Sequence, residues 1–518
     1  MTVEFFEKYA FKLKTLDELK AIIGTFPRNK KVIMCHGVFD VVHPGHVRHL
    51  AYAKTKAEIL VTSITADKHI KKGTYRPHVP ERLRALNLAA FEMVDYVIVD
   101  KNAKPLNNLS TLQPDFFAKG FEYTSDGLPA ATQEEADIVE NYGGEMIFTP
   151  GDIIYSSSNL IELAAPNIQL EKLLALMHGH KLSFNDLRMA LDKMKGFKVH
   201  VIGDTIVDSY TRTSLIGGQT KTPTFSVLYQ DKDDYIGGAG IVAQHLGAAG
   251  ANVTFSTVLG KDALAEFAIS GLKEAGISVN AIIDETRPTT NKNAIIAGGY
   301  RLLKIDTLDN RSISEVILEN LTQAISETET DAVVFSDFRH GMFNHWTVPK
   351  LTAAIPSDVY KVADSQVASR WGNITEFKNF DLVTPNEREA RFALGDQDST
   401  VGALSSALID ANDCKLLILK LGNRGAFVSR PGLTKDEDGN YFSVDSFAHN
   451  IADAVGAGDA LLSYATLSMM ATGNEVIAGI LGSMAAACEC EIDGNVPIKP
   501  ADVLTRIDHV EKAVGYGG

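Results

Sequence analysis

Cysteine and tryptophan are scarce in this chain of 518 residues, which contains four cysteines and two tryptophans. The cysteines are Cys35, Cys414, Cys488 and Cys490. So few thiols exclude a disulfide-rich scaffold, and reduced thiols are typical of the cytoplasm. Cys488 and Cys490 fall in an alanine-rich segment that predicts a helix, where adjacent-turn geometry opposes a disulfide between them. We therefore expect a cytoplasmic protein that folds without disulfides.

Long apolar runs and dense clusters of basic residues are also missing. The longest apolar stretches, such as 476–488, fall short of the roughly 20 residues that a transmembrane helix needs. No cationic segment with an apolar core opens the chain. The formal net charge is −15, and no run of Lys and Arg is dense enough to follow a phosphate backbone. We therefore expect neither a membrane nor nucleic acid as a partner.

The apolar residues that are present, 45% of the chain, suffice for two or three cores of about 100–200 residues each. Short β-branched runs alternate with helical patterns, which predicts α/β domains with parallel sheets covered by helices. The expected strands are 31–35, 59–64, 95–99, 198–202, 252–258, 332–335, 381–384 and 416–420, with a further strand pair within 205–235. Ligands of such sheets gather at the carboxyl ends of the strands.

The octapeptide at 453–460 combines a phosphate cradle with a candidate base. Gly456 and Gly458 bracket Ala457, and this pattern lets the backbone approach an anion and turn its N–H groups toward it. The apolar run that follows has a period of about 3.6, which predicts a helix whose N-terminus favours negative charge. Asp459 would stand beside a transferring phosphoryl group, where its carboxylate can take the proton from an attacking hydroxyl. The alternative is a glycine-rich turn capped by an aspartate.

Further motifs of the C-terminal half each follow an apolar run. They are Gly203-Asp204, Gly237-Gly238-Ala239-Gly240, Ser336-Asp337, Thr384-Pro385-Asn386-Glu387 and Lys420-Leu421-Gly422-Asn423-Arg424-Gly425. Together with the octapeptide, in this order and spacing, they resemble the ribokinase-like (PfkB) family of sugar kinases over roughly residues 196–518. The resemblance implies an α/β fold in which a small β-sheet lid at 205–235 covers the sugar and often pairs with its copy in a dimer.

The same resemblance implies roles for the matching residues. Asp459 would be the catalytic base, and the anion hole would consist of Gly456, Ala457 and Gly458. The residues near ATP and its magnesium-bound phosphates would be Asn386, Glu387, Lys420, Gly422 and Gly425. The residues near the sugar would be Asp208, Gly237 and Gly238. ATP with Mg²⁺ is thus implied, with no protein side chain as a direct metal ligand, and a homodimer is the implied assembly.

The N-terminal half carries its own motif between residues 33 and 50. An apolar strand ends at Gly37, and a turn delivers His43, Gly45 and His46 to the start of a helix. The two histidines are three positions apart, so both can face one ligand. Imidazoles at a helix N-terminus suit a triphosphate that is attacked at its α-phosphorus, either as hydrogen-bond donors or as cations.

Other interpretations of these histidines stay open at the level of sequence. Histidines at i and i+3 can bind zinc, although no third ligand stands at a recognisable spacing. They can also be incidental surface residues. A class I aminoacyl-tRNA synthetase has a related signature, but it would need a lysine-rich second signature. The nearest segment, 193–196, lacks the serine and the second lysine.

The residues around the histidines resemble the nucleotidyltransferase superfamily marked by His-x-Gly-His. The matching positions are Gly37, Phe39, Asp40, His43, Gly45 and His46. Further matches resemble the adenylyltransferase domain of the bifunctional heptose-7-phosphate kinase/heptose-1-phosphate adenylyltransferase family, over about residues 28–165. They are Lys72-Gly73-Thr74-Tyr75-Arg76-Pro77, Glu81-Arg82, Val94-Asp95, Pro114-Asp115, Lys119-Gly120 and Ser156-Ser157-Ser158-Asn159.

By this resemblance His43 and His46 hold the α- and β-phosphates in the transition state. Lys72 and Lys119 would neutralise the charged substrates. Donors to phosphate would be Ser156, Ser157 and Ser158. The implied nucleotide is ATP, with CTP second.

The order of the two parts is inverted relative to that family, in which the kinase comes first. We predict a nucleotidyltransferase domain at 1–165, a helical linker at 166–195 and a ribokinase-like domain at 196–518. The C-terminal half also departs from the family at Ile241, where the family has asparagine, and at 221–224, where a Pro-Glu-Ala-Pro segment is replaced. The identity of the sugar therefore stays open.

The sequence as a whole predicts a bifunctional enzyme. It would phosphorylate a sugar or sugar phosphate and couple a sugar 1-phosphate to a nucleoside triphosphate, releasing pyrophosphate. The alternatives are a single active domain, or a regulatory or scaffolding protein built on inactive copies of both folds. The joint presence of Gly456, Gly458, Asp459, His43 and His46 favours the enzyme.

Overall fold

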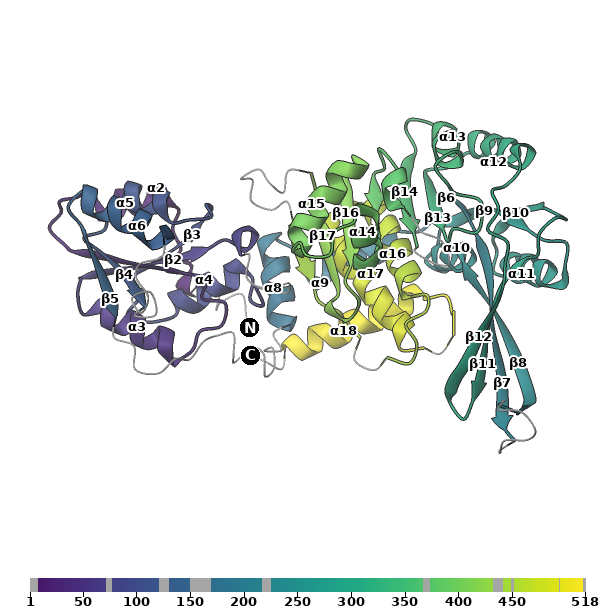
Figure 1. Cartoon of the computed structure of the whole chain (residues 1–518), viewed down its shortest axis with the longest axis horizontal. Helices are drawn as coiled ribbons and strands as arrows, with labels where there is room; N and C mark the ends of the chain where they lie inside the picture. The colour runs from purple at the N-terminus through teal and green to yellow at the C-terminus, as the bar shows by residue number, and fades with distance from the viewer. Residues whose placement is uncertain are drawn as a thin grey trace. The chain divides into compact units, whose positions relative to one another are not determined.

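A computed structural model describes residues 8–70, 77–120, 130–149, 169–216, 225–366, 373–431, 441–448, 451–492 and 494–515. The chain divides into two compact units (Figure 1). One comprises the residues up to Gly179 together with those from Val514 onward, and the other comprises His180–Ala513. Each unit has its own sheet and its own core.

The first unit is built on a parallel sheet with the strand order β3-β2-β1-β4-β5. The strands are β1 (Val32–Gly37), β2 (Ile59–Thr65), β3 (Tyr96–Asp100), β4 (Phe116–Gly120) and β5 (Glu145–Thr149). The three strands predicted in this half are confirmed. The strand order reverses between β1 and β4, and ligands of such sheets bind outside the carboxyl ends at this point.

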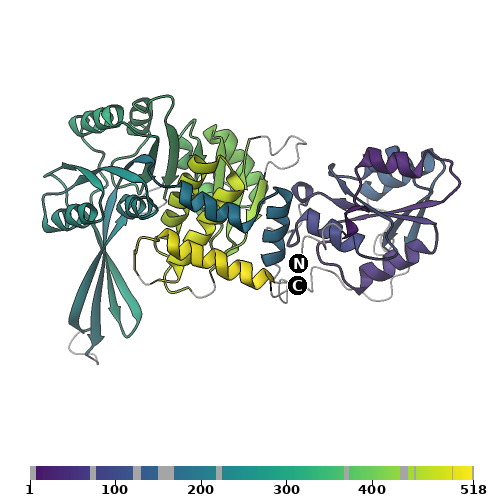
Figure 2. The ribbon, with the colours of Figure 1, turned by 180° about the vertical axis from the view of Figure 1, so that it is seen from behind.

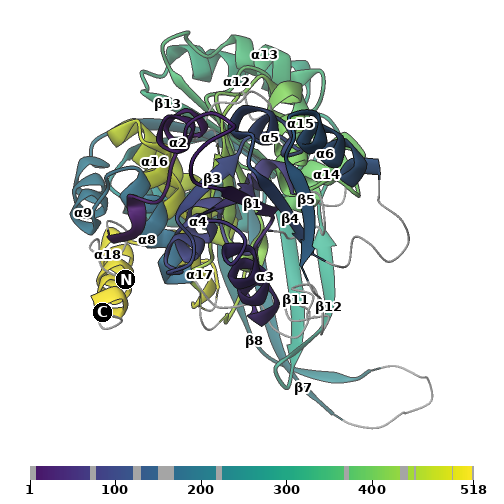
Figure 3. The ribbon, with the colours of Figure 1, turned by 90° about the vertical axis from the view of Figure 1, so that its left-hand side faces the viewer.

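Helices cover both faces of this sheet, as Figure 3 shows. Side chains alternate along β1, so Cys35 packs against α3 (Pro44–Lys54) and α4 (Glu81–Ala89), while Met34 packs on the opposite side. The opposite helices are α2 (Leu16–Ile23), α5 (Leu106–Leu112) and α6 (Ala130–Asn141). A further helix, α8 (Gln169–Gly179), packs on α4.

The second unit is built on a sheet with the order β10-β9-β6-β13-β14-β15-β16-β17-β18. Its strands are β6 (Lys198–Gly203), β9 (Asn252–Leu259), β10 (Ser278–Ile283), β13 (Ala332–Asp337), β14 (Tyr360–Ser365), β15 (Leu382–Val383), β16 (Leu416–Lys420), β17 (Ala426–Ser429) and β18 (Tyr441–Val444). The pairings from β10 to β16 are parallel, as predicted. The antiparallel edge formed by β17 and β18 was not predicted.

Helices cover both faces of this second sheet. One group consists of α12 (Glu315–Glu327), α13 (Thr347–Ala353), α14 (Glu387–Leu394) and α15 (Val401–Asn412). The other consists of α9 (Phe184–Lys193), α10 (Ala239–Ala248), α11 (Ala263–Glu274), α16 (Ala457–Thr472), α17 (Glu475–Cys490) and α18 (Pro500–Gly515), the last of them yellow in Figure 2. The central pair, α16 and α17, is apolar almost all round because it is buried between other elements.

A separate four-stranded sheet projects from the second unit and forms a lid (Figure 1). Its order is β12-β11-β7-β8, with β7 (Thr205–Leu215), β8 (Val227–Gly238), β11 (Thr290–Ala297) and β12 (Tyr300–Thr307). Strands β7 and β8 are antiparallel neighbours, so the strand pair predicted at 205–235 is confirmed. The contribution of β11 and β12 to the lid was not predicted.

The segment between the two predicted domains contains the two expected helices, α8 and α9. Helix α9 begins after Ser183, whose hydroxyl accepts a hydrogen bond from the N–H of Asp186 in a reciprocal capping box. The predicted domain boundaries stay predictions. All four cysteines are free, as expected. In the described part of the chain, no helix combines the length and apolar character that a membrane span requires.

Candidate active sites

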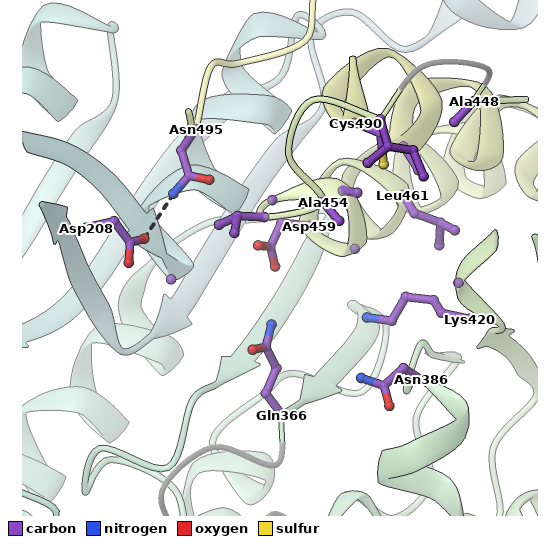
Figure 4. Close-up of a pocket in the computed structure, with 18 of the residues that line it drawn as sticks. Asp208, Gln366, Asn386, Lys420, Ala448, Ala454, Asp459, Leu461, Cys490 and Asn495 are labelled. Carbon is purple, nitrogen blue, oxygen red and sulfur yellow. Dashed lines mark hydrogen bonds between the residues drawn. The ribbon is translucent and has the colours of Figure 1, made fainter. Parts of the chain in front are cut away.

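A cavity of about 700 Å³ lies in the second unit, at the carboxyl ends of its parallel strands (Figure 4). The lid, the main sheet, α16 and α17 all contribute to its wall. Most of the site residues that the sequence predicted in the C-terminal half line this one cavity. They are Asp208, Gly238, Asn386, Lys420, Gly422, Gly425, Gly456, Ala457, Gly458 and Asp459. Their individual roles stay predictions.

Two of the predicted residues lie beside the cavity without lining it. Gly237 packs against the carboxylate of Asp208, which occupies the place that a Cβ on Gly237 would fill. Glu387 forms ion pairs with Arg391, at 2.8 Å, and with Arg424. The Glu387 carboxylate is therefore held by these two arginines, and the acidic residue of α14 that lines the cavity is Glu389.

The phosphate cradle is the start of α16. Gly456 is the N-cap residue with φ 85°, a conformation that glycine adopts without strain. The intrahelical hydrogen bonds begin with the N–H groups of Asp459 and Ala460, which both donate to the carbonyl of Gly456. Ala457 and Gly458 precede these bonds, and no side chain caps this helix end in the described structure. The backbone N–H groups here are therefore suited to an anion.

Asp459 lies between Asp208 and Lys420 in Figure 4. Its exposed fraction is 5%, and its Oδ1 atom has no hydrogen-bond partner among the described residues. Burial, followed by the negative charge of Asp364, raises the pKa of Asp459 to about 8, although Lys420 opposes the shift. A carboxylate with a pKa near the working pH suits general-base catalysis.

Lys420 ends β16 opposite the cradle and forms an ion pair of 2.8 Å with Asp364 at the end of β14. Burial works against its cation, yet Asp364 and Glu389 hold the pKa of Lys420 above its usual value. A Cβ built on Gly458 would lie 3.2 Å from its Nζ. The missing side chain of Gly458 thus lets a permanent positive charge approach the cradle.

Asn386 is the N-cap of α14 and positions Glu389. Its Oδ1 accepts a hydrogen bond of 2.9 Å from the N–H of Glu389, whose Oε2 accepts one of 2.7 Å from the N–H of Asn386. This reciprocal capping box fixes the Glu389 carboxylate at the cavity wall. The Asn-x-x-Glu spacing was a signal in the sequence that would have identified Glu389.

The cavity wall around Asp208 contains polar residues that sequence reasoning missed. Asn495 donates a hydrogen bond of 3.0 Å from Nδ2 to Oδ2 of Asp208, drawn as a dashed line in Figure 4. Lys292 of β11 and Lys304 of β12 line the cavity and stabilise the charge of Asp208. Arg301 of β12 also lines it. These residues belong to no motif, so no signal in the sequence identified them.

Two aspartates predicted at strand ends have a structural role instead. Asp204 accepts hydrogen bonds from the N–H groups of Phe338, at 3.0 Å, and His340, at 3.2 Å. Asp337 forms an ion pair of 2.8 Å with Arg339, and burial raises its pKa to about 7. Both do lie at the carboxyl ends of strands, but neither lines the cavity. They tie the end of β13 to its neighbours.

In the first unit, the two signature histidines lie together beyond the end of β1. His43 is the N-cap of α3, and its Nδ1 accepts a hydrogen bond of 3.1 Å from the N–H of Gly45. The rings of His43 and His46 lie 3.9 Å apart between centroids, and the ring of Phe39 lies 5.0 Å from that of His46. A Cβ on Gly45 would lie 2.9 Å from the His43 ring, so only glycine leaves this arrangement undisturbed.

The charge state of His46 decides whether this imidazole would bind phosphate as a hydrogen-bond donor or as a cation, which the sequence left open. Burial, followed by repulsion from His43 and His49, lowers the pKa of His46 to about 4. His46 is therefore neutral at pH 7, and a neutral imidazole binds phosphate as a hydrogen-bond donor. Its Nδ1 is buried without a hydrogen-bond partner among the described residues.

Asp40 and Arg84 hold the turns around this site. The Oδ1 atom of Asp40 accepts hydrogen bonds from the N–H groups of His78, at 2.8 Å, and Val79, at 2.9 Å. Arg84 is fully buried, with an ion pair of 2.5 Å to Asp67 and further hydrogen bonds to backbone carbonyls, including that of Val79. Sequence reasoning missed Arg84, although an arginine within the leucine- and alanine-rich segment 83–90 was a usable signal.

The remaining predicted residues of the first unit are only partly described. Gly37 ends β1, and Lys119 lies near the end of β4, where it forms an ion pair with Glu135. The predicted residues Lys72, Ser156, Ser157 and Ser158 lie outside the described residues. Within the described ranges, no group of three or more His, Cys, Asp or Glu side chains could hold a metal ion. The described residues therefore offer no support for the zinc interpretation.

A parallel sheet with a glycine-rich cradle at a helix start, covered by a β lid, defines the second unit as a ribokinase-like α/β domain. Residues 197–497 match the family of pfkB carbohydrate kinases. Because this match covers more than half of the chain, the protein belongs to the pfkB family. Residues 34–163 match the cytidylyltransferase-like family, so the nucleotidyltransferase-like part precedes the kinase-like part.

Similar proteins carry the name bifunctional protein HldE. The one from Geobacter metallireducens is 36% identical over 154 residues, which are 29% of this chain and 30% of that protein. The one from Desulfatibacillum aliphaticivorans is 24% identical over 321 residues, which are 60% of this chain and 63% of that protein. The chain thus spans 30% of the length of the first of these relatives.

A solved structure also resembles the second unit. Phosphofructokinase-2 from Escherichia coli, in complex with substrates and products, aligns with a TM-score of 0.51 and 16% sequence identity. The alignment covers 61% of this chain and 99% of that one. At this identity the likeness establishes the fold.

Proposed function

We propose that the protein is a bifunctional enzyme of nucleotide-sugar synthesis. The second unit phosphorylates a sugar phosphate with ATP, and the first couples a sugar 1-phosphate to a nucleoside triphosphate and releases pyrophosphate. The observation that carries the proposal is the buried carboxyl of Asp459, whose Oδ1 has no hydrogen-bond partner among the described residues, at a helix start that can bind an anion, opposite the charged Lys420. The relatives named bifunctional protein HldE and the two family matches support both halves.

In the kinase reaction, an acceptor hydroxyl attacks the γ-phosphorus of ATP. The hydroxyl proton passes to Asp459, a bond forms between the acceptor oxygen and phosphorus, and ADP leaves. The N–H groups at the start of α16 donate to the oxygens on which charge accumulates. Lys420 supplies a fixed positive charge, because Asp364 keeps it protonated. These groups need no reorganisation during transfer.

The residues at the nucleotide side fit a Mg²⁺ ion that arrives with ATP. Mg²⁺ keeps several waters and is usually bound by one or two carboxylates and substrate phosphates. The Glu389 carboxylate is fixed at the cavity wall, and Oδ1 of Asp364 is buried without a hydrogen-bond partner among the described residues. Glu389 would hold the ion through water, and the ion would neutralise phosphate oxygens.

In the nucleotidyl transfer, a phosphate oxygen of the sugar 1-phosphate attacks the α-phosphorus of the nucleotide. A phosphoanhydride bond forms, and pyrophosphate leaves. His43 and His46 lie at the start of α3, where the neutral imidazole of His46 and backbone N–H groups of the helix start can donate to the phosphates. ATP is the proposed nucleotide, with CTP second.

The lid side of the cavity favours a phosphorylated acceptor over an unphosphorylated sugar. Three cations of the lid line it: Lys292, Arg301 and Lys304. Asp453 neutralises Arg301 through an ion pair of 2.7 Å, and Asp208 lies near both lysines. Asp306 of β12 also acts on Lys292, so acidic residues act on all three cations, and their N–H groups can still donate to a phosphate group of the acceptor.

The test is a panel of sugars, sugar phosphates and nucleotides, read by product mass. We expect a phosphorylated acceptor and ATP to give ADP, and a sugar 1-phosphate to give pyrophosphate. Lys292→Met should raise the KM for the phosphorylated acceptor by about tenfold or more, the loss of one charged contact. Lys261→Met is the matched control, because Lys261 is exposed and pairs with Glu285. An unphosphorylated sugar as the best acceptor would contradict the proposed substrate class.

We further propose a cytoplasmic homodimer. The free cysteines support the compartment. Exposed apolar side chains on the lid, including Leu228, Tyr300 and Leu303, support self-association. Light scattering of the intact chain and of Leu303→Lys would test the dimer, since the substitution should shift the mass toward a monomer.

A further inference from the structure

Glu489 lies near the end of α17 with a fully buried side chain, directly behind the phosphate cradle. Its exposed fraction is 0%, and no described residue donates a hydrogen bond to either of its carboxyl oxygens. A Cβ built on Gly456, the N-cap of α16, would lie 2.7 Å from its Oε1. A carboxyl without a partner thus packs against the residue from which the cradle begins.

A second acceptor oxygen without a donor lies at the same place. The Oδ1 atom of Asn495 is buried without a hydrogen-bond partner among the described residues, and it lies 3.0 Å from the same built Cβ on Gly456. The Nδ2 atom of this amide donates to Asp208. Asn495 therefore connects the Asp208 carboxylate to the cradle, and its unused oxygen and Oε1 of Glu489 lie against the same face of Gly456.

Two buried acceptors with no donor between them are destabilising. A protonated carboxyl provides the missing donor, because it carries one O–H group. We propose that Glu489 is a positioning residue of the kinase site, acting as a neutral carboxylic acid. Its hydroxyl donates to Oδ1 of Asn495 and so fixes Asn495, Asp208 and the start of α16 relative to one another. An ionised Glu489 would place negative charge behind the cradle that must bind phosphate.

The surroundings of Glu489 keep it protonated. Burial, together with the smaller effect of the negative charges of Asp459 and Asp453, raises the pKa of Glu489 to about 8. The N–H of Val496 opposes the shift without reaching hydrogen-bond geometry. On its own segment, Cys490 is free and Glu491 is paired with Arg506.

Burial raises the pKa of both Asp459 and Glu489 to about 8, but Lys420 favours the ionised form of Asp459, so we assign the first ionisation of this pair to Asp459. Repulsion makes the second ionisation harder once the first has occurred. Catalysis needs Asp459 as the anion and Glu489 as the acid. The kinase rate should then rise with pH as Asp459 ionises and fall at higher pH as Glu489 does.

The test is Glu489→Gln, because glutamine keeps the shape and a donor but cannot ionise. It rests on the proposed kinase activity, measured with ATP and the acceptor that the panel identifies. We expect kcat at pH 7 within about threefold of wild type, the rising limb unchanged and the falling limb lost. Glu491→Gln, with the same charge change two positions away, should keep both limbs.

A readout without substrate separates this proposal from the kinase proposal. Wild-type protein should lose stability as pH rises from about 5 to 8, because its folded state keeps a proton on Glu489 that the unfolded state releases. The melting temperature of Glu489→Gln relative to wild type should therefore increase over this range. If no acceptor is turned over but this difference appears, the kinase proposal fails and the protonated Glu489 stands.

Two results would overturn the role of Glu489. One is a difference in melting temperature between Glu489→Gln and wild type that stays constant from about pH 5 to pH 8, because it would mean that Glu489 is ionised in the folded state. The other is loss of activity in Glu489→Gln at every pH together with a requirement of the wild type for K⁺ or Na⁺. That outcome would mean that the carboxyl oxygens of Glu489 and Oδ1 of Asn495 bind a cation. If the glutamine variant does not fold, Glu489→Met removes the same charge and gives the same melting comparison.

Discussion

Replacing Asp459 by Asn should remove the kinase activity and stabilise the protein. Asparagine keeps the shape of the side chain but cannot accept the proton of the attacking hydroxyl. The loss of a positioned general base lowers the rate by about 10²–10⁴. Nucleotidyl transfer from a supplied sugar 1-phosphate should be unchanged, because that reaction belongs to the first unit.

The stabilisation follows from the raised pKa of Asp459. In the fold its pKa is about 8, whereas an unfolded aspartate titrates at about 3.9. Between these values the folded state binds more protons than the unfolded state, so stability falls as pH rises. At pH 7, roughly three units above the unfolded value, this cost is about 4 kcal/mol. Asparagine avoids it, and the figure is an upper limit because the new amide also needs partners.

The assay combines turnover with urea unfolding at pH 7 and near pH 4. We expect Asp459→Asn to be more stable than wild type at pH 7 by up to about 4 kcal/mol, with the difference vanishing toward pH 4. Near-wild-type kinase turnover would remove Asp459 from its role as base. A stability difference between the variant and wild type that does not change from about pH 4 to pH 7 would refute the raised pKa even if activity were lost.

Three further outcomes are expected. His43→Ala or His46→Ala should cost nucleotidyl transfer at least ~2–4 kcal/mol of transition-state stabilisation and leave kinase activity intact, whereas stoichiometric zinc that is lost on mutation would favour a metal site. Arg84→Met should lower the free energy of unfolding by about 3–5 kcal/mol, because it strands the Asp67 carboxylate, and a change below about 1 kcal/mol in urea unfolding would contradict this. D-glycero-D-manno-heptose 7-phosphate should be a weaker acceptor than the true one in mass-read assays, and efficient turnover of it with ATP through both steps would contradict a shift in substrate.

The features that the sequence predicted are those encoded by neighbouring residues. The cradle at 453–460 and the histidine pair after β1 each lie within a few positions, so local spacing determines their chemistry. Strand-helix alternation likewise predicted both parallel sheets. The antiparallel edge escaped notice because β17 and β18 have four residues each, too few for a clear alternation.

The acceptor side could not be predicted, because distant segments form it. Asn495 and Asp208 are separated by 287 positions, and Lys292 comes from a third segment. Glu389 and Glu387 show a second limit. Both follow Asn386, but helix geometry turns Glu389 into the capping box at the cavity and Glu387 toward Arg391 and Arg424. Sequence spacing alone does not distinguish these orientations.

The structure explains the isoleucine at position 241, where the family has asparagine. Ile241 is fully buried on α10, so an apolar side chain there serves packing and leaves no unpaired polar group. An amide nevertheless stands at the cavity, supplied by Asn495 from the segment after α17 and bonded to Asp208. The polar group of the acceptor side therefore comes from another element and another direction. Because a site that hydrogen-bonds particular hydroxyls rejects ligands that leave its polar groups unpaired, the changed origin of this amide favours a changed pattern of sugar hydroxyls rather than a loss of selectivity.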